Sequence, residues 1–244
     1  MKQYDIGAIK TIALLGHGSS GKTTLAESML YYAGMTDRIG KTADGTSVMD
    51  FDPEEKKRGV SVSSSVFQFE YNDKKINLID APGLFDFAGG VTEALTAADS
   101  ALIVLSGKSG LNVGAQLNYA AAKKGGVPVS FFIGKLDSPR AYFYRVISTL
   151  TAHYGAVICP VVIPFVEGEQ VVSFVDLIEN RAYKYDGIKR SDAEMPESDD
   201  IKNMRDVMLE AVASVDEALM EKYFAGEEFD AAEIKSALAA GMQS

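Results

Sequence analysis

Apolar runs and amphipathic stretches alternate along the first 137 residues of the chain. A short continuous apolar run predicts a buried strand, whereas apolar residues three or four positions apart predict a helix. The patterns predict strands at 9–15, 62–71, 75–80, 101–105 and 127–133, and helices at 22–33, 115–124 and 139–153. This alternation implies an α/β fold with a mostly parallel sheet and helices on both faces.

Two other parts of the chain have a different pattern. Residues 34–61 are polar and poorly periodic, and a loop of that length inside a compact domain is usually functional or mobile. After residue 155 the pattern predicts strands at 158–165 and 170–174, a charged connector at 187–200, a helical stretch at 201–224, and a helix at 231–240 capped by Asp230. We therefore expect two domains, 1–155 and 156–244.

Composition and charge narrow the class of protein. With 244 residues, 47% apolar and 24% charged, the chain can bury a core, which excludes a disordered chain, collagen and a disulfide scaffold. Residues 1–150 hold 16 basic and 15 acidic side chains, whereas residues 151–244 hold 8 and 19. The acidic second part would repel phosphate backbones, so we expect no binding to free DNA.

Localisation follows from what the sequence lacks. The apolar run 157–166 is too short for a membrane span and contains Pro160 and Pro164. The first residues do not have the pattern of a signal peptide. A lone cysteine, Cys159, with apolar neighbours indicates a buried thiol more than a reactive one. We expect a cytoplasmic protein, monomeric and without a membrane partner.

Residues 16–23 read GHGSSGKT, the phosphate-binding pattern GxxxxGK[ST], between a predicted strand and a predicted helix. Glycines let the backbone curl around a phosphate, and the helix N-terminus adds its positive end. We expect Lys22 to neutralise the β- and γ-phosphates and the Thr23 hydroxyl to hold Mg²⁺. The predicted cradle consists of His17, Gly18, Ser19, Ser20, Gly21, Lys22, Thr23 and Thr24.

Two further motifs lie after the phosphate loop in the chain, RGVSV first and DAPG second. DAPG, residues 80–83, ends a predicted strand, so Asp80 is placed for a second Mg²⁺ contact and Gly83 offers an N–H to a γ-phosphate. RGVSV, residues 58–62, lies at the end of the long loop. The Ser61 hydroxyl can complete the Mg²⁺ shell and make the loop a switch; the alternative is a serine that merely precedes a strand.

GKLD, residues 134–137, follows the last predicted strand of this part. The stem of Lys135 can cover a purine face, and Asp137 can accept from guanine N1–H and N2–H₂, an edge that adenine lacks. Asp137 therefore favours GTP or GDP over ATP, and opposes a phosphate-loop ATPase or kinase.

These motifs, in this order, resemble the GTP-binding domain of translational GTPases, most closely elongation factor G and its paralogues. GKTTLAESMLYYAG (21–34), DAPGLFDF (80–87), FVDLIENRAYKYD (174–186) and DEALMEKYFAGEE (216–228) carry the likeness. The resemblance implies a P-loop NTPase fold, an inserted acidic α+β subdomain, GTP hydrolysis with Mg²⁺, and the ribosome as partner of a longer factor. Lys22 and Gly83 are the expected catalytic groups.

Four positions depart from the family pattern. Leu84 stands where the family has a histidine that positions water, and Gly134 where the base motif begins with asparagine. Ser19 replaces aspartate, and Ser61 replaces threonine but keeps the hydroxyl. Two alternatives therefore stand beside an elongation factor G-like GTPase: a non-catalytic or weakly catalytic guanine-nucleotide-binding module, and a ribosome-protection factor of the same superfamily.

Overall fold

The computed structural model describes residues 2–168, 170–187 and 189–242. The chain forms two compact units, one ending at Lys135 and one beginning at Leu136. The boundary predicted from sequence, between residues 155 and 156, lies later, because helix α5 (Phe143–Tyr154) falls in the second compact unit.

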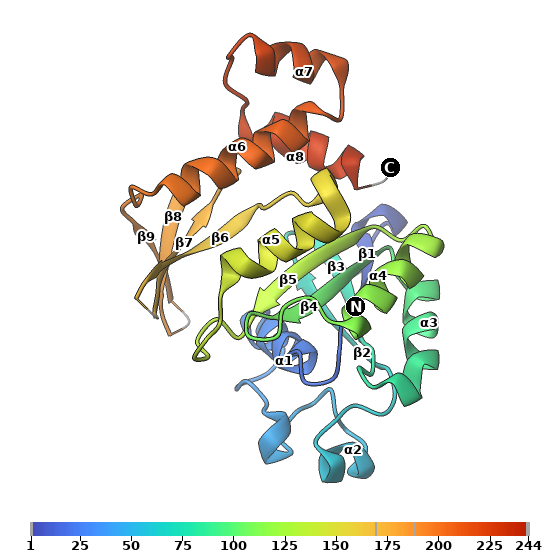
Figure 1. Cartoon of the computed structure of the whole chain (residues 1–244). Coiled ribbons are helices and arrows are strands. Elements are labelled where there is room, and N and C mark those ends of the chain that lie inside the picture. The colour runs from blue at the N-terminus through green and yellow to red at the C-terminus, as the bar shows by residue number, and fades with distance from the viewer. Residues whose placement is uncertain (1, 169, 188, 243–244) are drawn as a thin grey trace. The chain divides into compact units, whose positions relative to one another are not determined.

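The first unit is built on a five-stranded sheet in the order β2-β3-β1-β4-β5 (Figure 1). Its strands are β1 (Ile9–Leu15), β2 (Ser65–Tyr71), β3 (Lys74–Asp80), β4 (Ser100–Ser106) and β5 (Val129–Gly134). β2 runs antiparallel to β3, and all other neighbours are parallel, which confirms the mostly parallel sheet. Because Leu14 pairs with Asp80, β1 and β3 end at the same edge of the sheet.

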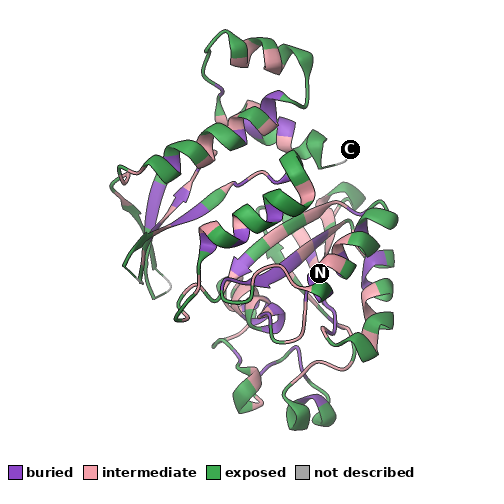
Figure 2. Ribbon diagram, in the orientation of Figure 1, coloured by how far each residue is buried: buried purple, intermediate pink, exposed green. Residues whose placement is uncertain are grey.

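Helices cover both faces of this sheet. Helix α1 (Lys22–Tyr32) packs on one face, and α3 (Ala88–Ala97) and α4 (Val113–Lys124) pack on the other (Figure 1). Figure 2 colours the buried residues purple. Ala13, Leu14 and Leu15 are the last three residues of β1 and all have 0% exposure, so this end of the strand is covered on both sides. This explains the continuous apolar runs of the sequence. The pattern did not predict α3, which begins with Ala88, Gly89 and Gly90.

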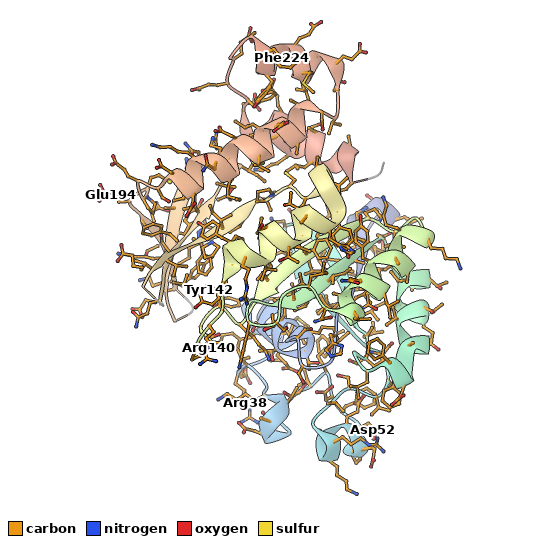
Figure 3. The ribbon with its side chains drawn as sticks, in the orientation of Figure 1. Arg38, Asp52, Arg140, Tyr142, Glu194 and Phe224 are labelled. Carbon is orange, nitrogen blue, oxygen red and sulfur yellow. The ribbon has the colours of Figure 1, made fainter. Side chains whose placement is uncertain are left out.

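The long polar loop contains a helix that the periodicity did not predict. Helix α2 (Pro53–Arg58) begins after Asp52, which is labelled in Figure 3. Asp52 and Glu55 form a capping box, and Pro53 occupies the first turn. The predicted strand 62–71 begins later, at Ser65, because the N–H groups of Val62 and Ser63 donate to the Glu55 carboxylate and not to a strand.

The second unit contains an antiparallel sheet in the order β6-β7-β8-β9. Its strands are β6 (Val162–Glu167), β7 (Gln170–Asp176), β8 (Arg181–Asp186) and β9 (Lys189–Ala193). The prediction of a connector at 187–200 was wrong, because β9 and the start of α6 lie within it. The first four residues of β9 are polar and exposed, and only Ala193 is apolar, so the strand has no apolar alternation. Its pairing with β8 is accompanied by stacking of Arg190 on Tyr183, 3.6 Å from the ring centre.

The described residues of the second unit include the α-helices α5, α6 (Asp199–Ala213), α7 (Glu217–Phe224) and α8 (Ala231–Gly241). The helical stretch predicted at 201–224 is interrupted, because Asp216 accepts from Ala218 N and starts α7. The predicted cap of the last helix is confirmed: Asp230 and Glu233 form a capping box. None of the helices in the described parts of the chain is long and apolar enough to cross a membrane.

Candidate functional site

The loop between β1 and α1 curls tightly at the edge of the sheet. Gly16 and Gly21 have φ values of 144° and 108°, and Ser19 is left-handed at 59°. A Cβ at Gly16 would lie 2.5 Å from the Val104 carbonyl oxygen, so the close approach of loop and β4 requires glycine. Alternating backbone conformations of this kind turn successive N–H groups toward one point, where an anion can bind.

A buried lysine points back into this loop. Lys22 is 5% exposed, and its Nζ donates to the carbonyl oxygens of Gly16 and His17 at 3.1 and 3.2 Å. Burial lowers the pKa of Lys22, while Asp80 and Asp50 act in the opposite direction. Gly83 packs directly on this amine, because a Cβ there would overlap Nζ and lie 2.8 Å from Gly18 N. The residues predicted to be catalytic, Lys22 and Gly83, are thus in contact.

The oxygen atoms predicted to bind Mg²⁺ also lie together. Thr23 Oγ1 donates to Asp80 Oδ2 at 2.6 Å, and Ser61 Oγ lies 3.3 Å from Thr23 Oγ1. Asp80 is 0% exposed, and burial raises its pKa to about 6. Its Oδ1 has no hydrogen-bond partner among the described residues. A buried carboxylate oxygen without a partner, beside two hydroxyls, fits the donor set of a hydrated Mg²⁺ ion.

One acidic residue of the site was missed by the sequence analysis. Asp50 is 4% exposed, and its Oδ1 accepts from Ser61 Oγ at 2.7 Å. Burial raises the pKa of Asp50, and the Ser61 hydrogen bond opposes this effect. Asp50 lies outside every motif, eleven positions before Ser61. The only signal was its place in the long loop that a switch would use.

Lys22, Thr23, Asp50, Ser61 and Gly83 line a pocket of about 210 Å³. From the phosphate loop and helix α1 it contains Gly18, Ser19, Gly21, Lys22, Thr23 and Thr24. Its other walls are Thr42, Asp50, Gly59, Val60, Ser61, Gly83, Leu84 and Lys135. A larger concavity of about 380 Å³ in the second unit contains none of the residues that the sequence predicts to bind nucleotide or metal, and we assign it no chemistry.

The residues predicted to read a base are separated by the division between the units. Lys135 is left-handed, and its Nζ donates to Ser19 O at 2.8 Å, so its stem lies along the phosphate loop. Asp137 is an exposed residue of the second unit, and its contact with a base stays a prediction. At Gly134 an added Cβ would lie 3.1 Å from the Phe132 ring. There is therefore little space at this position for the asparagine side chain of the family pattern.

The remaining residues that the sequence analysis singled out lie in the phosphate loop or beside it. His17 does not line the pocket; its ring lies 5.7 Å from the Phe85 ring. Ser20 is buried, and its hydroxyl has no partner among the described residues, whereas Thr24 is exposed. Leu84 is 36% exposed and lies against Gly18, whose added Cβ would be 3.0 Å from Leu84 Cδ2. An apolar side chain therefore borders the phosphate end of the pocket.

Three comparisons with known proteins match nearly the whole chain. The family model of the elongation factor Tu GTP binding domain matches residues 8–240. Elongation factor G 2 of Syntrophus aciditrophicus (strain SB) is 34% identical over 239 residues, which cover 96% of this chain and 35% of that protein. A crystal structure of a protein from Thermus thermophilus superposes with a TM-score of 0.90 and 34% identity, covering 97% of this chain and 36% of that one. The chain spans about a third of the length of these relatives.

Proposed function

The chain belongs to the family of the elongation factor Tu GTP binding domain, and from this membership we propose that it binds guanine nucleotides with Mg²⁺ and hydrolyses GTP. In this proposal it is the switch domain of an elongation factor G-like translation factor that acts on the ribosome in the cytoplasm. Similarity to an elongation factor G 2 over nearly the whole chain supports the assignment.

One observation carries the proposal: the Thr23 and Ser61 hydroxyls and the buried Lys22 line one pocket, and the buried Asp80 carboxylate accepts from Thr23. Mg²⁺ is typically held by one or two protein carboxylates together with phosphate oxygens and water. Thr23, Ser61 and Asp80 would hold the hydrated ion, and Asp80 Oδ1, which lacks a partner among the described residues, could accept a hydrogen bond from one of its water molecules. When bound, the ion would neutralise negative charge on the β- and γ-phosphate oxygens.

The chain's own groups supply the remaining steps. Lys22 exchanges its two carbonyl partners for phosphate oxygens, and the Gly83 N–H donates to the γ-phosphate. Lys135 covers the purine, and Asp137 accepts from the guanine edge. Catalysis is then electrostatic, because fixed donors stabilise the charge that develops during phosphoryl transfer. The attacking water is positioned by backbone groups or by the ribosome, since the Leu84 side chain forms no hydrogen bonds.

Leu84 favours a second candidate function, a guanine-nucleotide-binding module that does not hydrolyse GTP. In the Leu84→His variant, an imidazole replaces the apolar side chain at the border of the pocket. A large gain in ribosome-stimulated GTP turnover would support the second candidate, because the native site would then lack its water-positioning group. Measurable turnover by the native chain that Leu84→His leaves unchanged would support the first, because another group would already position the water.

Nucleotide titration tests the proposal directly. Fluorescent GDP, GTP and ATP analogues are titrated onto this chain with and without Mg²⁺. Lys22→Ala removes the buried amine of the loop, and Lys10→Ala, which removes an exposed lysine of β1, is the matched control. We expect guanine-selective binding that Lys22→Ala abolishes and Lys10→Ala preserves. Equal affinity for ATP and GTP, or binding that does not depend on Lys22, would contradict the proposal.

A further inference from the structure

A fully buried glutamate lies outside the phosphate-binding octapeptide 16–23 and does not line the pocket. Glu27 is on helix α1, one turn after Thr23, and its side chain has 0% exposure. A carboxylate in such a position must be satisfied by hydrogen bonds. It accepts from four donors, all in the loop that follows α1: Ser47 Oγ at 2.7 Å, Val48 N at 2.7 Å, Met49 N at 3.0 Å and Gly40 N at 3.2 Å.

The loop is fitted closely around this carboxylate. A Cβ at Gly40 would lie 2.5 Å from Glu27 Oε2 and 2.8 Å from the Thr46 carbonyl oxygen, so the loop approaches closely only with glycine there. Met49 is 1% exposed and belongs to the core cluster that includes Leu14 and Leu30. Both the polar contacts and the apolar contacts therefore fix residues 40–49 against α1.

The same segment continues directly into the predicted metal site. Asp50 N donates to Ser47 Oγ at 3.1 Å, which orients the residue next to Met49. The Asp50 carboxylate accepts from Ser61 Oγ at 2.7 Å, and Ser61 Oγ lies 3.3 Å from Thr23 Oγ1. The contacts form a closed path that leaves α1 at Glu27 and returns to the same helix at Thr23.

We propose that Glu27 is a positioning residue for the metal site: it holds residues 40–49 on α1, and thereby places Asp50 so that Ser61 faces Thr23. This inference rests on the proposed function, because it assigns Ser61 to Mg²⁺. It predicts that the loss of Glu27 disturbs the loop contribution to the site while Lys22 and Thr23 keep their places on the phosphate loop and α1.

Glu27→Gln is the informative change because it preserves size and removes acceptor capacity. A carboxylate offers two acceptor oxygens, whereas an amide offers one oxygen and an NH₂ group that donates. The amide nitrogen must face either Gly40 N or the donors at residues 47–49, so at least one N–H loses its partner. Glu54→Gln is the matched control, because Glu54 is an exposed glutamate of the same loop that pairs with Arg58.

The experiment combines two readouts on the whole chain. Amide hydrogen exchange of residues 40–50 reports whether the loop stays on α1, independently of any ligand. Titrations of GTP and GDP analogues at several Mg²⁺ concentrations report the site. For Glu27→Gln we expect faster exchange at 40–50 and about tenfold or greater loss of Mg²⁺-dependent GTP affinity, the size typical of groups that orient metal ligands. GDP affinity should change less, because loop order is tied to the γ-phosphate.

Each other result overturns the inference. Unchanged exchange at 40–50 would show that Glu27 does not hold the loop. Equal loss of GTP and GDP affinity together with a lowered Tm would show a structural role only. If Glu27→Gln does not fold, Ser47→Ala repeats the test, because it breaks the same path by removing one donor to Glu27 and the acceptor of the Asp50 N–H. If the unchanged chain binds no guanine nucleotide, the proposed function fails and the positioning role fails with it, whatever the exchange shows.

Discussion

Gly83→Ala is the sharpest single test of how the phosphate loop and the end of β3 fit together. An added methyl would overlap Lys22 Nζ and lie 2.8 Å from two backbone atoms, Gly18 N and His17 C. The amine can move, but the backbone atoms belong to the curled loop and cannot yield without opening it. Gly83 has no left-handed φ, so the effect is one of space alone.

The expected loss of nucleotide affinity in Gly83→Ala follows from how closely the neighbouring atoms surround Gly83. Inserting a methyl into a packed position costs about 1–3 kcal/mol. If the cost falls on the phosphate-binding geometry, nucleotide affinity drops roughly 5- to 150-fold. The side chain of Lys22 would also be displaced from the Gly16 and His17 carbonyl oxygens that it now contacts. We therefore expect a weakened site in a folded domain.

The assay is the Kd of a fluorescent GDP analogue, measured beside the thermal unfolding temperature. Gly89→Ala is the matched control, because it lies in α3 with nothing within 4 Å of an added Cβ. It should bind normally and be slightly stabilised, since alanine favours a helix over glycine by about 1 kcal/mol. Wild-type affinity in Gly83→Ala would refute the reasoning, because it would show that the phosphate loop can accommodate a methyl group at this position.

Three further predictions concern single side chains. Asp80→Asn removes the buried carboxylate beside Thr23 and should weaken Mg²⁺-dependent GTP binding by roughly 10–100-fold; titration at varied Mg²⁺ checks it, and unchanged Mg²⁺ dependence would exclude the role. Asp137→Asn should lose guanine nucleotides and gain xanthine nucleotides, whose O2 accepts where guanine donates; competition binding measures this, and retained GTP preference would contradict it. Cys159 is half-buried, not fully buried as the sequence indicated, and this desolvation raises the pKa of its thiol to about 11, so alkylation should be slow at pH 8 and accelerate as the pH approaches 11; fast labelling at pH 8 in the folded protein would contradict the raised pKa.

Much of the fold and part of the site could be predicted from sequence because the relevant residues are neighbours in the chain. The phosphate loop is eight consecutive residues, and its glycines and Lys22 act within that span. Asp80 was found because it ends an apolar strand, and the pairing of Leu14 with Asp80 brings the two motifs to one edge. Strand β9 and helix α2 were missed, since their stability comes from pairing with β8 and from capping, not from apolar periodicity.

The sequence by itself determined the sheet, the phosphate loop and the type of ligand that the motifs favour, because each depends on adjacent residues and on the spacing of apolar positions. Only the tertiary structure decided that Asp50 faces Ser61 and that Glu27 holds residues 40–49, because these partners are 11 to 22 positions apart in a polar loop without periodicity. The physical reason is burial. A carboxylate removed from water must find donors, and which donors reach it depends on how the loop packs on helix α1, not on its neighbours in the chain.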